Sequence, residues 1–236
     1  SVPTLGEFDF QMLSTTAWAY AELDVDDAPL LDAIAAEARS RLEAARSAGL
    51  ASELSPLAVL ATTHALAEAQ RLDSSFLEEA SAVLQAIGTG LDTAARAEAD
   101  DGLGTVAPSS SRSAAAGDGE DGRPFILCDS RDVCVIWKPP GWITIPADHS
   151  AEEGGDLGDS SDPDGASGPT LTGFAAEHLG ADHPVALDAQ VQNGLVHRLD
   201  RDTSGAVCCA KTYLGYYLSV LQFSARRVQK EYVCLC

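Results

Sequence analysis

Basic residues are scarce in this sequence. Its 236 residues include 15 Lys plus Arg against 36 Asp plus Glu, which gives a formal net charge of -21. Because phosphate neutralisation requires cations, this balance excludes a general electrostatic binder of nucleic acid, and any such partner needs a local basic patch. Long apolar runs are also absent, since none approaches the roughly 20 residues that span a bilayer. Residues 1–30 lack a basic segment followed by an apolar stretch, so we expect no membrane partner.

Cysteine is missing from the first half of the chain, and no two cysteines have the C-x-x-C spacing of zinc sites. The six cysteines lie in apolar, strand-like runs: Cys128, Cys134, Cys208, Cys209, Cys234 and Cys236. We therefore expect reduced thiols, no metal, and a reducing intracellular compartment. Cytoplasm and organelle both stay open, because the sequence begins with Ser rather than Met.

Lysine is absent from residues 8–97, where Ala and Leu dominate and apolar residues recur at helical spacing. A shift of about 46 residues lays Trp18–Glu22 over His64–Glu68, and the similarity continues into the residues that follow. We therefore expect residues 1–97 to form an α-helical repeat region of two stacked helix-turn-helix units.

The run from Leu13 to Ala21 resembles the pattern L-x-N-T-x-W-A-x-A of octotricopeptide-like helical repeats, which are linked to organellar RNA, although Thr15 replaces the usual Asn. The resemblance implies an RNA-related repeat. A plain helical array that contacts a protein partner is the alternative, and the absence of lysine weighs against direct RNA contact. Trp18 and Tyr20 are predicted to lie in the helical core rather than to stack on bases.

Two stretches have the composition of unstructured segments. Residues 98–123 are rich in Asp, Gly, Ser and Ala and are predicted to be an interdomain linker. Residues 148–168 contain acidic residues and no Lys or Arg, and we interpret them as an acidic surface insertion. A calcium loop does not fit, because the Gly and Glu placement of such a loop is missing. The insertion belongs to a second predicted domain, residues 124–236.

The second domain has alternating strand and helix signals. Residues of high strand propensity at 125–128 and 133–138 predict two strands of a hairpin. A helix is expected at 171–179, followed by a strand at 206–211 and a helix at 212–224. We therefore expect an α+β fold, with an N-terminal α-helical repeat array and then a domain with a largely antiparallel sheet.

Charge is concentrated in the stretch Gly194–Gly205, which reads G-L-V-H-R-L-D-R-D-T-S-G. Acidic, basic and imidazole side chains lie there between two apolar runs. Charged groups near a core are costly unless they serve a function, so this stretch is the candidate site. It also begins the one basic stretch of an acidic chain, which contains Arg198, Arg201, Lys211, Arg226, Arg227 and Lys230.

The order of motifs resembles that of RsuA/RluA-type pseudouridine synthases. These motifs are Lys138–Gly141 (K-P-P-G), the long and specific string His197–Gly205, Gln222-Phe223, and Lys230–Tyr232. The resemblance covers residues 125–236 and implies an enzyme without a cofactor that isomerises uridine to pseudouridine in RNA. Ribosomal RNA, transfer RNA and organellar transcripts all stay open as substrates.

The resemblance implies roles for individual residues. Asp200 matches the catalytic nucleophile, whose attack on the sugar or on the base stays open. Arg198 is implied to enter the RNA stack in place of the flipped uridine. Tyr232 matches the tyrosine that stacks on the uracil and assists proton removal from C5. Arg201 and Lys230 are expected to contact phosphates.

Other residues of the motifs have plainer interpretations. His197 is expected to orient its neighbours near the RNA rather than to act as a base, and Asp202 to form turn and capping bonds. Lys138 is interpreted as covering the sheet with its aliphatic stem. Arg226 and Arg227 complete the predicted RNA-binding set.

The family also has a downstream G-R-x-H-Q-[LI]-R segment, whose arginine pairs with the catalytic aspartate, and this sequence contains no such segment. We expect the chain to be a fragment of a longer protein with an incomplete synthase domain, in which Tyr232 lies in the last strand. The alternative is a non-catalytic RNA-associated or adaptor protein that retains the motif.

Overall fold

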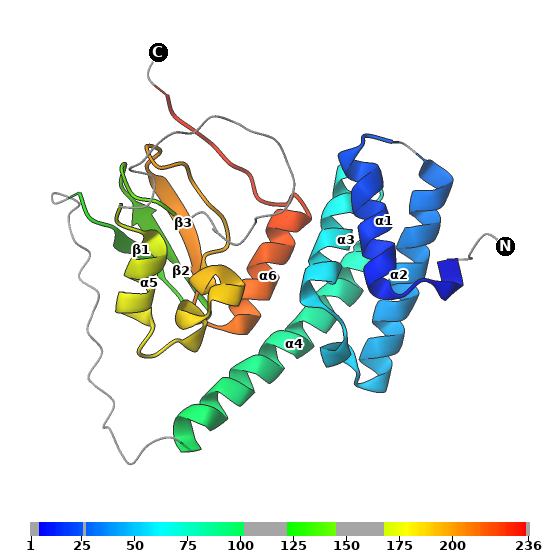
Figure 1. Ribbon diagram of the computed structural model, residues 1–236, viewed down its shortest axis with the longest axis horizontal. Helices are drawn as coiled ribbons and strands as arrows, with labels where there is room; N and C mark the ends of the chain where they lie inside the picture. Colours follow the sequence, from blue (N-terminus) through cyan, green and yellow to red (C-terminus); the bar gives the residue numbers. More distant parts are fainter. Residues whose placement is uncertain (1–4, 26, 102–121, 145–167, 235–236) are drawn as a thin grey trace. The chain divides into compact units, whose positions relative to one another are not determined.

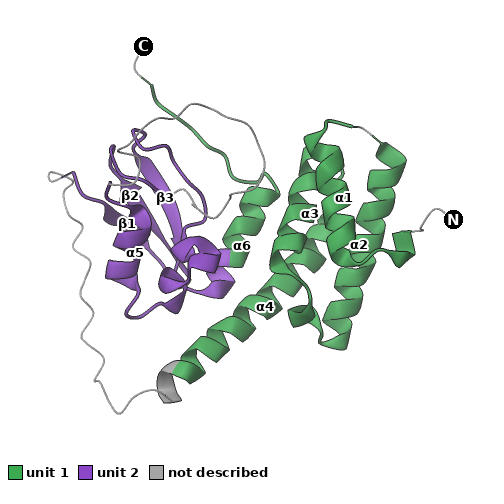
Figure 2. Cartoon of the chain, in the orientation of Figure 1, with its two compact units in different colours: residues 1–98, 217–236 green, residues 99–216 purple. Residues whose placement is uncertain are grey.

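The computed structural model describes residues 5–25, 27–101, 122–144 and 168–234. The chain divides into two compact units (Figure 2), one of residues 1–98 and 217–236 and one of residues 99–216. In these described ranges no helix is both long and apolar enough to cross a membrane.

The first unit contains four helices of the N-terminal half (Figure 1), α1 (Phe10–Glu22), α2 (Ala28–Ala48), α3 (Pro56–Glu68) and α4 (Ser74–Asp101). The bounds of α1 and α3 differ by the same 46 residues at both ends, and so do the starts of α2 and α4. The helices therefore follow the internal shift that the sequence shows.

The turns and caps between these helices repeat with the same shift. Asp24 and Gln70, which follow α1 and α3, both have left-handed backbone angles, with φ of 51° and 56°. Asp27 and Asp73 each accept a hydrogen bond from the backbone N–H three residues later, at 3.1 and 2.6 Å. Such caps satisfy donors that the first helical turn leaves without a partner. The resemblance to octotricopeptide-like repeats itself stays a prediction.

Helix α1 packs on α3, and the Ser14 hydroxyl donates to the Ala58 carbonyl at 3.1 Å. Leu13 and Ala17, four residues apart on one helical face, are fully buried. Trp18 is 47% exposed, so the prediction that it lies in the core is wrong. One residue advances the helix by about 100°, which turns Trp18 away from the face that Ala17 shares with Leu13.

Helix α4 continues to Asp101, past residue 98, where the sequence predicts the linker to begin. Its last turns are rich in alanine, a strong helix former, and contain no proline or glycine before Gly102. Residues 102–121 and 145–167, which hold most of the predicted linker and acidic insertion, lie outside the described residues.

The second unit is built on an antiparallel sheet of β1 (Phe125–Asp129), β2 (Val133–Lys138) and β3 (Gly205–Ala210), in that order. Helix α5 (Leu171–Leu179) covers one face, and its apolar residues share a core with β2 and β3 that includes Ile136 and Val207. The sheet, the hairpin and the helix at 171–179 confirm the predicted α+β class.

Helix α6 (Tyr213–Ser224) follows β3, and residues 227–234 after it adopt no regular structure. The predicted strand around Tyr232 is therefore wrong. Tyr232 is 66% exposed and Val233 is 99% exposed. A strand must satisfy its backbone through a neighbouring strand, and no described segment pairs with these residues.

Candidate functional site

A turn with left-handed backbone angles comes directly before the charged residues of the stretch Gly194–Gly205. Gln192, Asn193 and Gly194 have φ of 54°, 55° and 79° in succession. A Cβ on Gly194 would lie 2.6 Å from the Ala210 carbonyl oxygen, so only glycine fits there. After this turn the Val196 N–H donates to the Cys208 carbonyl of β3 at 3.1 Å. The stretch therefore enters the site as a strand-like segment beside β3.

Residues 197–204, which we call the motif loop, connect this segment to β3. The Thr203 N–H donates to the Asp200 carbonyl at 3.1 Å, which closes a turn. The side chains of Arg198, Asp200, Arg201 and Asp202 are all exposed. Asp200 is an exposed residue, so its carboxylate is accessible to solvent.

Lys138, at the end of β2, holds this loop through hydrogen bonds to its backbone. The sequence does not predict these bonds. Its side chain is fully buried, and its ammonium donates to the carbonyls of Asp200, Arg201 and Thr203 at 2.9, 2.8 and 2.7 Å. The interpretation that Lys138 only covers the sheet with its aliphatic stem therefore misses the contacts of its ammonium group. Burial lowers the pKa of Lys138, and the carboxylates of Asp202 and Asp200 act in the opposite direction.

Thr144 is a second support that sequence reasoning missed. This buried hydroxyl donates to the Leu199 carbonyl at 2.7 Å and accepts from the Leu199 N–H at 3.1 Å. The Gly141 N–H donates to the Arg201 carbonyl at 2.9 Å. The K-P-P-G motif pointed to this region, but nothing in the local sequence distinguishes Thr144 from an ordinary β-branched residue.

His197 is held by the backbone of β3, because the Cys208 N–H donates to its Nε2 at 3.1 Å. An imidazole nitrogen that accepts a hydrogen bond carries no proton, so this contact selects the neutral ring with its proton on Nδ1. The expected orienting role of His197 stays a prediction. Its predicted proximity to RNA stays a prediction.

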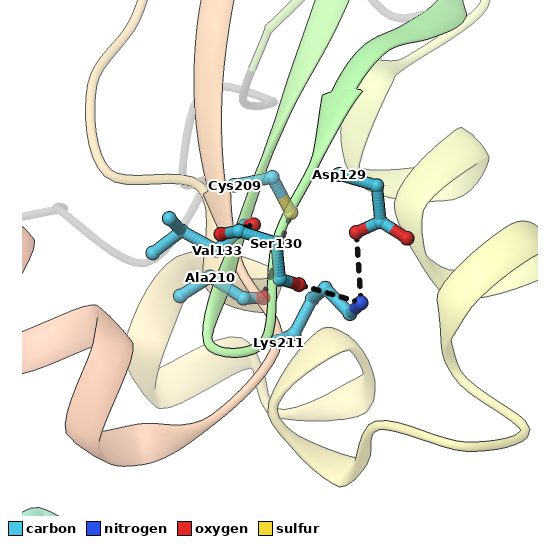
Figure 3. A network of polar contacts seen from close by, with 6 residues as sticks. All are labelled: Asp129, Ser130, Val133, Cys209, Ala210 and Lys211. Atoms are coloured by element: carbon cyan, nitrogen blue, oxygen red, sulfur yellow. Dashed lines mark hydrogen bonds and ion pairs between the residues drawn. The ribbon is translucent and has the colours of Figure 1, made fainter.

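Two cations of the predicted basic stretch are engaged within the protein. Figure 3 shows the Lys211 ammonium bonded to the Asp129 carboxylate, at 2.8 Å, and to the Ser130 carbonyl, at 2.9 Å. The Arg226 guanidinium pairs with the Glu68 carboxylate. Lys211 therefore fixes the β1–β2 turn, and Arg226 is less available to phosphates than the sequence suggests.

The remaining predicted residues lie in the first unit. The Lys230 ammonium lies 5.5 Å from the centre of the Phe223 ring, a cation–π distance, and Arg227 and Tyr232 are exposed. The structure therefore brings Arg198, Asp200 and Arg201 together on one loop of the second unit. Tyr232, Lys230 and Arg227 follow α6 on a separate segment.

Comparison with known proteins identifies the same region. The family model described as RNA pseudouridylate synthase matches residues 132–236. Two curated relatives carry the name "Ribosomal large subunit pseudouridine synthase D": one from Borreliella burgdorferi is 28% identical and one from Xylella fastidiosa is 34% identical, each over 110 residues. These alignments cover 47% of this chain and 29% and 27% of the relatives, so the chain spans less than a third of their length. No solved structure matches.

The matched range contains β2, the motif loop, β3 and the segment with Tyr232, and it excludes the helical residues of the N-terminal half. The match confirms the resemblance carried by the K-P-P-G and H-R-L-D-R-D-T-S-G motifs. The C-terminal part of this chain, residues 132–236, is therefore similar to the RNA pseudouridylate synthase family.

Proposed function

We propose that this chain isomerises uridine to pseudouridine in RNA, with Asp200 as the nucleophile. The supporting observation is the contrast between the fixed backbone of the motif loop and the exposed carboxylate of Asp200. A nucleophile must be held in place and still be accessible to its substrate, and the loop combines both properties.

The reaction is an isomerisation, so the atoms of substrate and product balance. The bond from sugar C1′ to base N1 breaks, the uracil turns, and a bond from C1′ to C5 forms. The proton leaves C5 and a proton is gained at N1. Asp200 forms a transient covalent bond that is broken again, and no oxidant, metal or cofactor is consumed. We assign proton removal from C5 and stacking on the uracil to Tyr232.

RNA binding by an acidic protein requires local cations, and Arg198 and Arg201 are exposed on the motif loop itself. We assign Arg198 to the space left by the flipped uridine and Arg201 to a phosphate. Lys230 and Arg227 are further phosphate contacts in this proposal, His197 orients the loop near the RNA, and Arg226 contributes less.

The salt dependence of RNA binding tests this assignment. Each phosphate contact to single-stranded RNA contributes a slope of about -0.7 to the plot of log affinity against log salt. The change Arg201→Gln should reduce the slope by about that amount, whereas Arg131→Gln, at an exposed arginine of the β1–β2 turn, should leave the slope unchanged. Equal slopes for Arg201→Gln and the unchanged chain would remove Arg201 from the interface.

The enzymatic activity is tested with RNA that carries tritium at C5 of uridine, because the isomerisation releases that tritium to water. The names of the curated relatives make RNA of the large ribosomal subunit the first substrate to try. We expect tritium release that depends on the chain. A chain that binds the RNA without releasing tritium would instead be an RNA-associated adaptor that retains the motif.

A further inference from the structure

The motif loop is held almost entirely through its backbone. Lys138 contacts three carbonyls of the loop, and its fourth and longer contact is to the Pro139 carbonyl, at 3.3 Å. An ammonium has three hydrogens, so the three short bonds use its whole donor capacity. Thr144 engages both backbone groups of Leu199 with a single hydroxyl. Together these two side chains fix the backbone on both sides of the Asp200 side chain.

Both supports are themselves fixed by the sheet and by α5. Lys138 pairs with Gly205 in the register of β2 and β3, so its position is set by the strand that receives the loop. Ile143, next to Thr144, forms a bridge with Thr170, and its backbone bonds to Pro169 and Leu171 at 3.0 and 2.7 Å. The loop is therefore held by the last residue of β2 and by a segment that is itself bonded to the start of α5.

We propose that Lys138 and Thr144 are positioning residues that hold the motif loop so that the Asp200 carboxylate is presented in one place. This inference rests on the proposed function, in which Asp200 is the nucleophile. Neither side chain reaches the substrate, because both are buried beneath the loop. Arg198 and Arg201 lie on the same loop, but their long side chains can follow a small displacement of the backbone, whereas the short side chain of Asp200 cannot. Substrate binding should therefore suffer less than the chemical step.

The cleanest test uses two substitutions at Thr144. Thr144→Val keeps the shape of the side chain and removes the hydroxyl, whereas Thr144→Ser keeps the hydroxyl. A displacement of a catalytic group by about 1 Å costs on the order of 100-fold in rate, so Thr144→Val should lower kcat for tritium release by about 10- to 100-fold. KM should change by less than about threefold, and Thr144→Ser should retain nearly full kcat. Lys138→Met, which keeps the stem without the ammonium, should have the larger effect.

Amide hydrogen exchange of the peptide that contains residues 197–204 gives a readout independent of activity. We expect faster exchange of these amides in Thr144→Val and in Lys138→Met, and unchanged exchange in Thr144→Ser. If Lys138→Met fails to fold, the two Thr144 variants decide the question. Unchanged loop exchange and unchanged kcat in Thr144→Val would overturn the proposal. Absence of tritium release from the unchanged chain would refute the proposed function instead, while the exchange result would still decide whether the two residues hold the loop.

Discussion

Gly215, in the first turn of α6, is a position where a single added methyl group should destabilise the second unit. A Cβ at Gly215 would lie 2.2 Å from the Asp132 carbonyl oxygen, far inside van der Waals contact. That oxygen belongs to the backbone of the β1–β2 turn and accepts a hydrogen bond from the Lys211 N–H at 2.8 Å. The carbonyl therefore cannot move aside without breaking that bond.

Two opposing effects decide the result of Gly215→Ala. Alanine favours the helix over glycine by about 1 kcal/mol, because glycine loses more backbone entropy on folding. Overpacking a close contact costs about 1–3 kcal/mol, and contact with a bonded backbone carbonyl belongs at the upper end of that range. We therefore expect Gly215→Ala to lower the free energy of unfolding of the second unit by about 1–2 kcal/mol.

Gly90 in α4 offers the matched control, because a Cβ there would have no neighbour within 4 Å. Gly90→Ala should therefore raise the free energy of unfolding of the helical part by roughly 0.5–1 kcal/mol, because only the higher helix propensity of alanine acts there. Peptide-resolved hydrogen exchange is the suitable assay, since two units can unfold separately and a single melting transition would mix them. If the amides of β1 and β2 exchanged no faster in Gly215→Ala than in the unchanged chain, the steric reasoning would be refuted.

Two further predictions concern titratable groups of the second unit. The hydrogen bond with Cys134, together with burial, raises the pKa of the Cys209 thiol, whereas Cys128 is exposed. Iodoacetamide should therefore alkylate Cys128 in the native protein and Cys209 only after unfolding, and equal labelling rates by mass spectrometry would contradict this. Burial, and then the charge of Lys211, lower the pKa of His183 below its ordinary value of 6.5. The folded unit then binds the proton less readily than the unfolded chain, so this stabilising contribution is complete above pH 6.5 and is lost as the pH falls. His183→Gln should flatten the decline of the unfolding free energy between about pH 7 and pH 5, and an unchanged decline would exclude His183 as its source.

The hairpin and α5 could be predicted from the sequence because their signals are local. Strand-forming residues fill 133–138, and the apolar run at 171–179 follows a threonine whose hydroxyl caps the helix, Thr170. The same kind of local signal placed a strand at Tyr232 and failed, because a strand also requires a partner and no described segment supplies one. The predicted burial of Trp18 was wrong for a related reason, since burial in α1 depends on which face of the helix contacts α3.

Only those site residues that belong to a sequence motif could be predicted. The H-R-L-D-R-D-T-S-G string predicts Asp200 and Arg198 as site residues, and the structure has both exposed on one loop. The sequence does not predict the supports of that loop, because the partners of Lys138 and Thr144 are backbone carbonyls more than fifty residues away. Backbone groups carry no sequence signature, so such contacts become visible only when the fold is known.

The central claim is that the Asp200 carboxylate converts uridine to pseudouridine, and the most direct measurement is the nucleoside itself. RNA of the large ribosomal subunit is incubated with the chain, digested to nucleosides and separated by chromatography. We predict that the unchanged chain and Asp202→Asn, which alters a neighbouring exposed carboxylate, form pseudouridine at rates within about threefold of each other. Asp200→Asn should form none above the background without protein, because an amide cannot replace the carboxylate as a nucleophile. Pseudouridine formation by Asp200→Asn at the rate of the unchanged chain would contradict the account.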